Sequence, residues 1–306
     1  APVLTTFKAK GQISDHHPLG CGVLGRSGTP VASWLMNESD LLVVFGASFS
    51  NHTGIAPYKP IVQVDFDPMA LGRFHPVTVP VLGHVGVTAR HLLDRLPPAG
   101  GWTDQRGDVA ARWEIWRAEK ARRLADDHGH GVSAAAVFDA MTRLVPADAV
   151  ITVDVGNNAY SFGRYFEVER QSVLMSGYLG SIGFGFPAAM GAWAAAPERP
   201  IVAVTGDGGF GQYLAELTTA VRYAMPITHV LLDNHELGKI TKEQRAVEMD
   251  VWHTDLHNPD FATYAELCGA QGIRVDRSDQ LDQALTSALA HQGPSLVAVT
   301  SDVDLL

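Results

Sequence analysis

Cysteine is scarce in this sequence, and long apolar runs are missing. The 306 residues include only Cys21 and Cys268, which lie far apart and without C-x-x-C spacing. A disulfide framework and a thiolate zinc site are therefore not expected, and a reducing, cytoplasmic location is the default. The apolar stretches fall short of the roughly 20 residues that span a bilayer, so no membrane association is expected.

Positive charge is also in short supply. Lys and Arg number 23 against 33 Asp and Glu, which gives a formal net charge of −10. Nucleic-acid binding is not expected, because that function needs a basic face to neutralise phosphates. The one Arg-rich stretch, residues 117–127, mixes acids with bases at helical spacing and predicts a solvated helix with internal ion pairs.

What is present divides into two α/β regions. The first contains the β-branched runs "DLLVVFG" and "PIVQVDFD", then a segment of helical periodicity over residues 85–96, and it ends in Pro and Gly. A polar helix over about residues 104–127 connects it to the second region. We expect a central domain over 1–97, a linker helix over 98–130 and a second domain over 131–306.

The second region alternates apolar strands with helical segments. It opens with an amphipathic helix for which Ser133 is the expected N-cap. Alternation of this kind predicts parallel sheets covered on both faces, so the fold class is α/β with two doubly wound parallel-sheet domains. The predicted strands are "AVITVD", "SVLMS", "PIVAVTGD", "PITHVLLDN", "IRVD" and "SLVAVT".

The stretch "VTGDGGFGQY" permits two interpretations. Gly206, Gly208 and Gly211 spell G-x-G-x-x-G between a strand and a helix, and Asp233 follows at about the distance of a ribose-binding acid, as in a nicotinamide-dependent oxidoreductase. However, Asp207 would bring negative charge to the phosphate cradle unless a cation lies between them.

A divalent-metal site uses the same residues better. Asp207 ends one predicted strand and Asn234 ends the next, and such ends can be neighbours in a parallel sheet. Carboxylate and amide oxygens suit Mg²⁺, which commonly takes its other ligands from a diphosphate. Gly208 and Gly209 would let backbone N–H groups approach that diphosphate.

The sequence "GDG", then 25 residues, then Asn234 resembles the thiamine-diphosphate motif. The segment 175–195 resembles the part of that family that cradles the aminopyrimidine ring, and "ITVDVGNN" resembles its strand and turn at the active-site mouth. Residues 40–54 and 61–73 resemble the central domain of acetolactate synthase and pyruvate oxidase relatives. The similarity covers nearly the whole chain and implies a pyrophosphate-binding C-terminal fold.

The resemblance also implies roles for residues. The Asp207 carboxylate, the Asn234 side chain and the Glu236 backbone carbonyl would bind the metal. The Ile182 side chain would support the cofactor in its V-shaped conformation. The Gly180 carbonyl and the Ile182 N–H would contact the edge of the pyrimidine ring, which takes part in the catalytic step. For Ile182 an ordinary core position is the alternative, and for the paired asparagines a simple turn is the alternative. The implied cofactor-binding set is Asn157, Asn158, Gly180, Ser181, Ile182, Gly206, Asp207, Gly208, Gly209, Phe210, Asn234, Glu236, Leu237 and Gly238.

The implied activity is that of an acetolactate synthase-like lyase or transferase that uses thiamine diphosphate and Mg²⁺. Its substrate would be a 2-oxo acid, with pyruvate favoured, which is decarboxylated before the C2-bound enamine is transferred or oxidised. FAD is considered near residues 46–54 but not favoured, since many relatives of this type have lost the flavin.

The resemblance also implies a catalytic group on another domain. Family members activate the cofactor with a glutamate on an N-terminal pyrimidine-binding domain, and by this resemblance we expect the chain to begin inside the central domain, after that domain's first strand and helix. We therefore expect the C-terminal portion of an enzyme, incomplete without that domain or subunit and forming a homo-oligomer with it. A non-catalytic α/β module with a vestigial site and an NAD-binding oxidoreductase are the alternatives.

Overall fold

The computed structural model describes residues 1–47, 52–97, 103–126, 128–177 and 179–305. The contacts divide the chain into two compact units, Ala1–Phe7 with His17–Trp116 and Lys8–His16 with Arg117–Leu306. The division falls inside helix α3 (Arg106–Leu124), and the short segment Lys8–His16 belongs to the second unit. The domain limits expected from the sequence stay a prediction.

The first unit holds two small sheets in which every strand pairing is parallel. Helix α1 starts after Thr29, whose side chain accepts a hydrogen bond from the Ala32 N–H. Met36, Ile55, Ala56 and Ile61 form its buried apolar cluster. The elements are β1 (Val3–Thr5), β2 (Gly20–Val23), α1 (Pro30–Glu38), β3 (Leu42–Phe45), β4 (Ile61–Asp65), β5 (Val79–Leu82) and α2 (Val85–Arg95). The short helix η1 (Phe7–Ala9) has its first residue in this unit and the other two in the second unit.

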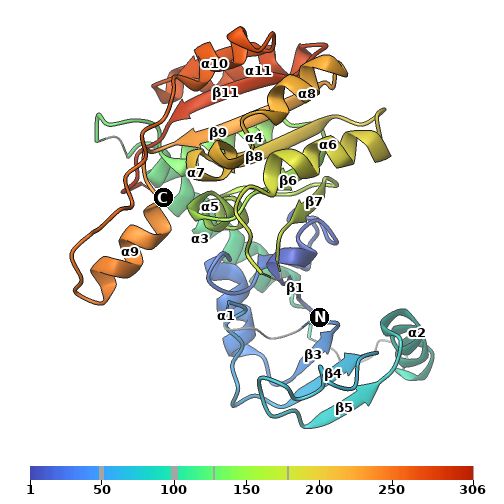
Figure 1. Cartoon of the computed structure of the whole chain (residues 1–306). Coiled ribbons are helices and arrows are strands. Elements are labelled where there is room, and N and C mark those ends of the chain that lie inside the picture. The colour runs from blue at the N-terminus through green and yellow to red at the C-terminus, as the bar shows by residue number, and fades with distance from the viewer. Residues whose placement is uncertain (48–51, 98–102, 127, 178, 306) are drawn as a thin grey trace. The chain divides into compact units, whose positions relative to one another are not determined.

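A six-stranded parallel sheet forms the centre of the second unit (Figure 1). Its strand order is β10-β11-β9-β8-β6-β7, so the chain crosses over between strands as in a doubly wound fold. All six strands predicted from the sequence are confirmed, and with them the α/β class. The strands are β6 (Val150–Val153), β7 (Ser172–Met175), β8 (Ile201–Gly206), β9 (Ile227–Asp233), β10 (Gln271–Val275) and β11 (Ser295–Thr300).

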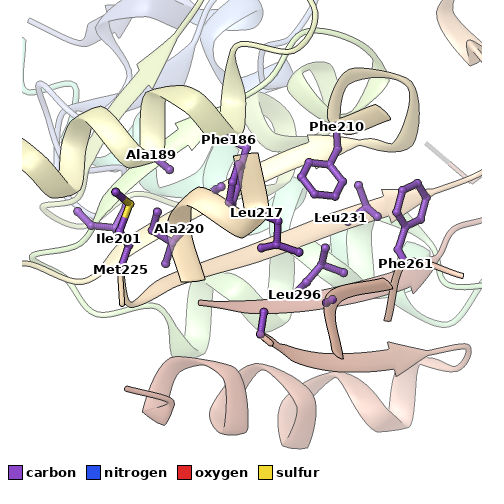
Figure 2. Packing of buried hydrophobic residues seen from close by; sticks show 14 of the residues in the cluster. Phe186, Ala189, Ile201, Phe210, Leu217, Ala220, Met225, Leu231, Phe261 and Leu296 are labelled. Carbon is purple, nitrogen blue, oxygen red and sulfur yellow. The ribbon is translucent and has the colours of Figure 1, made fainter. Parts of the chain in front are cut away.

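Helices cover both faces of this sheet. On one face, apolar residues of α6, α8 and α10 pack against alternate strand residues, as Figure 2 shows for Phe186, Leu217 and Phe261. On the other face, Thr228 of β9 donates a hydrogen bond to the Ala288 carbonyl of α11. The helices are α4 (Ala134–Leu144), α5 (Asn157–Tyr165), α6 (Gly185–Ala195), α7 (Asp207–Phe210), η2 (Gly211–Tyr213), α8 (Glu216–Arg222), α9 (Gly238–Ala246), α10 (Phe261–Leu267), η3 (Ser278–Gln280) and α11 (Leu281–Ala290).

The start of α4 agrees with the sequence. Ser133 caps this helix as predicted, since its side chain accepts a hydrogen bond from the Ala136 N–H. After Asn234 the chain forms helix α9, in which Lys239 pairs with Glu243 one turn later.

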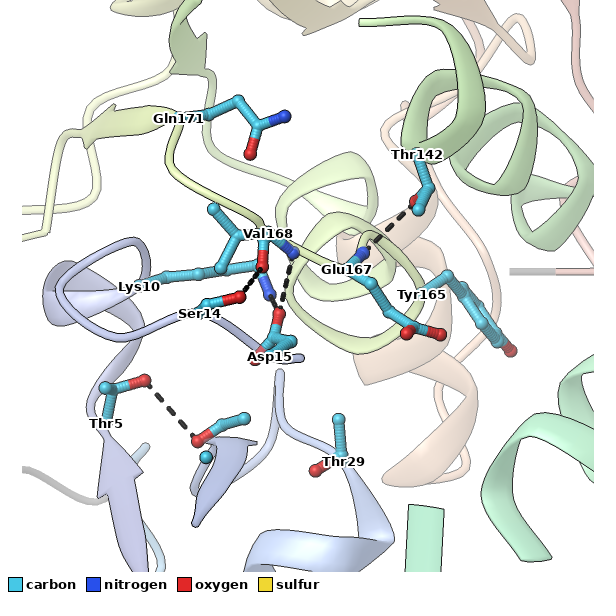
Figure 3. A network of polar contacts seen from close by, with 12 residues as sticks. Thr5, Lys10, Ser14, Asp15, Thr29, Thr142, Tyr165, Glu167, Val168 and Gln171 are labelled. Atoms are coloured by element: carbon cyan, nitrogen blue, oxygen red, sulfur yellow. Dashed lines mark hydrogen bonds and ion pairs between the residues drawn. The ribbon is translucent and has the colours of Figure 1, made fainter. Parts of the chain in front are cut away.

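The Arg-rich part of α3 is less solvated than the sequence suggested. Arg122 and Arg123 pair with Glu119, which confirms the internal ion pairs. Lys120, in contrast, is buried and lies 3.2 Å from Glu167, a buried acid in the connection between α5 and β7. Figure 3 shows Glu167, whose N–H donates a 3.1 Å hydrogen bond to the Thr142 hydroxyl. One face of the helix therefore packs inward within the second unit.

Among the helices of the described ranges, none combines the length and the apolar character that a bilayer crossing requires.

Candidate functional site

The carboxyl ends of β8 and β9 form the edge at which the predicted metal ligands meet. The two strands pair in register, with Gly206 opposite Leu232. Asp207 follows the first strand and Asn234 follows the second, so the sheet brings them to the same edge, as the sequence predicted. Figure 1 shows both strands ending beside the short helix α7.

Asp207 is a buried carboxylate with defined partners. Its Oδ1 accepts a 2.9 Å hydrogen bond from the Gly208 N–H, and its Oδ2 accepts one of 2.8 Å from the Asn258 side chain. Burial, together with the nearby Asp233 carboxylate, raises the pKa of Asp207 to about 6. A bound cation would stabilise the charged form of this carboxylate.

The sequence analysis considered Asp233 only as a ribose-binding acid, and it did not predict Asn258 at this edge. The Asn258 amide lies 2.8 Å from Asp233 Oδ1 as well as 2.8 Å from Asp207 Oδ2. Two acids that end neighbouring parallel strands were a usable signal for Asp233. Asn258 could not be found in this way, because it returns from a distant segment.

The backbone around Glu236 is held by a second strand-like segment. The Leu237 N–H donates to the Thr254 carbonyl, and the Leu256 N–H donates to the His235 carbonyl, each at 2.7 Å. Asn234 Oδ1 accepts the Glu236 N–H at 3.2 Å. These bonds fix the peptide that carries the carbonyl proposed as the third metal ligand.

At three glycines of the site, a Cβ would press against a neighbouring side chain, which would then have to shift. A Cβ would lie 2.7 Å from Leu237 Cδ2 at Gly208, 2.3 Å from Asp154 Oδ2 at Gly209, and 2.8 Å from Asn157 Nδ2 at Gly238. Their backbone is therefore what a ligand at this edge would meet.

Phe210 points away from that ligand space. Its ring is fully buried and packs 5.5 Å from the Phe186 ring and 4.4 Å from the His229 ring (Figure 2). Only the backbone of Phe210 remains available for the diphosphate contact that the resemblance implied.

Asn157 and Asn158 open helix α5 and differ in surroundings. Asn158 is buried and donates a 3.0 Å hydrogen bond to the Asp154 carbonyl, which is a structural contact. Within the described residues, the buried Asn157 Nδ2 has no hydrogen-bond partner, and it lies beside Gly238. Asn157 is thus the better candidate for a ligand contact.

The loop before α6 carries the predicted pyrimidine contacts. Gly180 and Gly183 have φ of +65° and +87°, which only glycine adopts readily, and the Ser181 N–H donates to Ser176 Oγ. Ile182 is 36% exposed, so its side chain is not an ordinary core residue. Tyr178, in the same predicted segment, lies outside the described residues.

The donor chemistry fits thiamine diphosphate and Mg²⁺. Within the described ranges, the acids, histidines and cysteines form no group of three that could hold a metal ion by themselves. The set here is instead one carboxylate, one amide oxygen and one backbone carbonyl, the hard oxygen donors that leave Mg²⁺ open to phosphate oxygens. The Asn157 amide adds a donor beside them.

A separate cavity of about 440 Å³ shares no residue with this cluster. It is lined by the end of α3, Ser133, Tyr165 and the last described residues. Its two arginines bond to Glu119, and Arg123 also bonds to the Tyr165 hydroxyl. The predicted metal ligands lie at the β8–β9 edge and not in this cavity.

Comparisons with known proteins support a cofactor site in the second unit, which contains the β8–β9 edge. Residues 154–299 match the model of the thiamine pyrophosphate enzyme C-terminal TPP binding domain, and residues 1–92 match the model of the same family's central domain. The first match begins at Asp154 and includes the whole β8–β9 edge.

Curated relatives of this chain include proteins named as thiamine pyrophosphate-containing or as acetolactate synthases. YdaP of Bacillus subtilis, named as a thiamine pyrophosphate-containing protein, is 34% identical over 98% of this chain and 52% of its own length. The acetolactate synthase isozyme 3 large subunit of Escherichia coli is 30% identical over 99% of this chain and 54% of its own. The sulfoacetaldehyde acetyltransferase of Rhodobacter capsulatus is 31% identical over 95% and 54%.

The chain spans about half the length of the curated relatives it matches. The comparisons give no support to a flavin, which the sequence did not favour either. Residues 48–51 of the segment considered for FAD lie outside the described residues.

Proposed function

Because this chain belongs to the thiamine pyrophosphate enzyme family, we propose that it binds thiamine diphosphate through Mg²⁺ at the β8–β9 edge. We further propose an acetolactate synthase-like reaction on a 2-oxo acid, with pyruvate as the favoured donor. Identities of 30–31% to two acetolactate synthase large subunits support this reaction class. The acetyltransferase relative supports transfer to an acceptor as the second half of the reaction.

The chain's own residues would bind and orient the cofactor. Asp207, the Asn234 side-chain oxygen and the Glu236 carbonyl would hold Mg²⁺, and the backbone of Gly208 and Gly209 would line the diphosphate. When bound, thiamine diphosphate supplies a carbon nucleophile and an electron sink for decarboxylation of the 2-oxo acid.

Ile182 and the backbone of Gly180 would orient the pyrimidine end. An exposed aliphatic side chain such as that of Ile182 can support an apolar ring and exclude water beside it. The observation that carries the whole proposal is the pairing of β8 with β9, which sets the buried Asp207 beside Asn234 at one sheet edge.

We also propose that catalysis requires a further domain or subunit that supplies the activating glutamate of the family. The relatives are about twice as long as this chain, which leaves room for such a domain in them. In this proposal the complete enzyme is a homo-oligomer that works in the cytoplasm.

The decisive experiment is calorimetric titration of thiamine diphosphate into the chain, first with Mg²⁺ and then with EDTA. We expect binding in Mg²⁺ that EDTA abolishes, and loss of that binding in Asp207→Asn. The matched control is Asp276→Asn, which changes an aspartate that follows β10 of the same sheet. Equal binding by Asp207→Asn and the unchanged chain would overturn the metal assignment.

The same titration separates the competing functions. Metal-independent binding of NADH would favour an oxidoreductase built on the glycine turn. If thiamine diphosphate does not bind even when a pyrimidine-binding domain is added in trans, the site is vestigial and the chain is a non-catalytic module. If that mixture binds, pyruvate decarboxylation by the mixture tests the proposed donor.

A further inference from the structure

The Asp154 carboxylate lies completely buried just after β6. Its Oδ1 accepts a 2.7 Å hydrogen bond from the Val155 N–H, and both of its oxygens lie 3.0 Å from the Gly183 nitrogen. Its own N–H donates to the Val204 carbonyl of β8 at 2.8 Å. One side chain thus ties the end of β6 to the start of α6.

The turn after β8 contacts the same carboxylate from another direction. A Cβ at Gly209 would lie 2.3 Å from Asp154 Oδ2 and 3.3 Å from the Gly183 nitrogen. A Cβ at Gly185 would lie 3.0 Å from Asp154 Cβ. Gly209 therefore lies beside both the Asp154 carboxylate and the Gly183 nitrogen.

The chemistry of this contact favours a carboxylate over other side chains. Burial raises the pKa of Asp154, while backbone N–H groups, first that of Val155 and then those of Gly183 and Gly185, favour its charged form. A neutral amide of the same shape would turn an N–H₂ group toward these donors and lose part of the bonding.

We propose that Asp154 is a positioning residue that sets the spacing between the loop 180–183 and the turn 206–210. Under the proposed function, on which the ligand part of this inference rests, the first segment faces the pyrimidine end of the cofactor and the second faces its diphosphate. A ligand that touches both segments then depends on Asp154, although Asp154 contacts neither end of it.

The binding test compares a ligand that spans both segments with one that touches only the turn. Asp154→Asn is titrated with thiamine diphosphate and with inorganic pyrophosphate, each in Mg²⁺. We expect an affinity loss of about tenfold or more for thiamine diphosphate and less than about threefold for pyrophosphate. Equal losses for both, or no loss for either, would overturn the positioning role.

The matched control is Asp65→Asn. Asp65 also ends a buried strand, β4, and accepts a 2.9 Å hydrogen bond from the Asp67 N–H, but it belongs to the other unit. This variant should bind both ligands as the unchanged chain does. If thiamine diphosphate binds neither to the unchanged chain alone nor to its mixture with a pyrimidine-binding domain, the proposed function fails, and the next measurement still decides on Asp154.

Hydrogen exchange in the ligand-free chain tests the spacing without any cofactor. In Asp154→Asn, peptides that carry 180–185 and 206–211 should both exchange faster, whereas Asp65→Asn should leave them unchanged. Unchanged exchange in 206–211 would overturn the inference, because the turn would then not rest on Asp154.

A second variant guards against a simple folding defect. Gly209→Ala pushes a methyl group against Asp154 Oδ2 and should increase exchange in the same two peptides. Asp154→Ala makes room for that methyl, so Asp154→Ala/Gly209→Ala should exchange no faster than Asp154→Ala alone. Additive effects of the two changes would contradict a direct contact.

Discussion

The side-chain amide of Asn258 donates a 2.8 Å hydrogen bond to the carboxylate of Asp207. The same nitrogen lies 2.8 Å from Asp233 Oδ1, so one neutral donor sits between two acids. Like charges this close repel, and a bridging N–H₂ group offsets that repulsion when no cation is bound. Asn258 should therefore stabilise the metal-free protein more than the metal-bound protein.

Asn258→Ala should lower the free energy of unfolding by about 1–3 kcal/mol in EDTA, because two largely buried acceptors lose their donor. The loss should be smaller in excess Mg²⁺, since a cation at Asp207 then neutralises the pair of acids. Urea unfolding followed by circular dichroism in both conditions measures the difference.

Gln244→Ala is the control for that variant. Gln244 also uses its amide within the segment after β9, where both its oxygen and its nitrogen bond to the Trp252 backbone, but it is only partly buried. We expect a change within about 0.5 kcal/mol, the same with and without Mg²⁺. An Asn258→Ala effect that is equally insensitive to Mg²⁺ would contradict the role given to Asn258.

Ile182→Ala should separate ligand binding from stability. The side chain is 36% exposed, so its removal should cost the ligand-free protein less than about 1 kcal/mol. Under the proposed function the same change removes apolar contact with the cofactor, and the affinity for thiamine diphosphate should fall about 5–30-fold. Calorimetric titration and thermal unfolding measure the two quantities.

Leu179→Ala is the matched control, since Leu179 lies in the same loop and is 82% exposed. Its replacement should leave both affinity and stability close to those of the unchanged chain. If Ile182→Ala loses stability as a core variant does and keeps its affinity, the alternative of an ordinary packing residue is correct.

The central part of the second unit could be predicted from the sequence because its signals are local. Strands buried on both faces are mostly apolar runs, and "PIVAVTGD" and "PITHVLLDN" are such runs. In a parallel sheet the carboxyl ends of paired strands share an edge, so Asp207 and Asn234 could be brought together without coordinates. The N-cap of α4 at Ser133 is equally local.

Contacts between distant segments could not be predicted in this way. Asn258 reaches Asp207 from 51 residues away, and Asp154 reaches Gly183 across 29 residues. Nothing near either residue in the sequence marks its partner, because the partner is set by how loops return to the sheet. The burial of Lys120 was missed for the same reason, since its partner Glu167 is 47 residues distant.

His229 should make stability depend on pH. It is fully buried in β9, its Nε2 lies 2.8 Å from Thr205 Oγ1, and burial lowers its pKa to about 3 from an ordinary value of 6.5. The unfolded chain thus binds a proton between pH 6.5 and 3 that the folded chain does not. Stability from this group is complete above pH 6.5 and falls by up to about 1.4 kcal/mol per pH unit below it.

His229→Phe removes the titrating group while keeping a ring beside Phe186 and Phe210. From about pH 7 to about pH 5 the free energy of unfolding should decrease in both proteins. The decrease should be about 1–2 kcal/mol smaller in His229→Phe than in the unchanged chain. Urea unfolding at the two pH values provides the comparison. Identical pH dependence in the two proteins would show that His229 is not buried as a neutral ring.

The ion pair of Lys10 and Asp15 should anchor the segment Lys8–His16 to the second unit. The two side chains are 2% and 4% exposed and lie 2.9 Å apart, and Asp15 also accepts the Val168 N–H at 2.8 Å (Figure 3). Lys10→Met leaves a buried carboxylate without its cation and should lower the unfolding free energy by about 3–5 kcal/mol.

The double variant Lys10→Met/Asp15→Asn decides whether the charges or the shape of the segment matter. Removing both charges leaves no unpaired ion, and the amide oxygen introduced by Asp15→Asn would still accept from Val168, so the double variant should be more stable than Lys10→Met alone. Calorimetric unfolding of the double variant and both single variants gives the coupling between the two changes. A double variant as unstable as the sum of its single changes would mean that Lys10 and Asp15 contribute independently, and that backbone contacts such as the Asp15 N–H to Val168 carbonyl bond hold the segment instead.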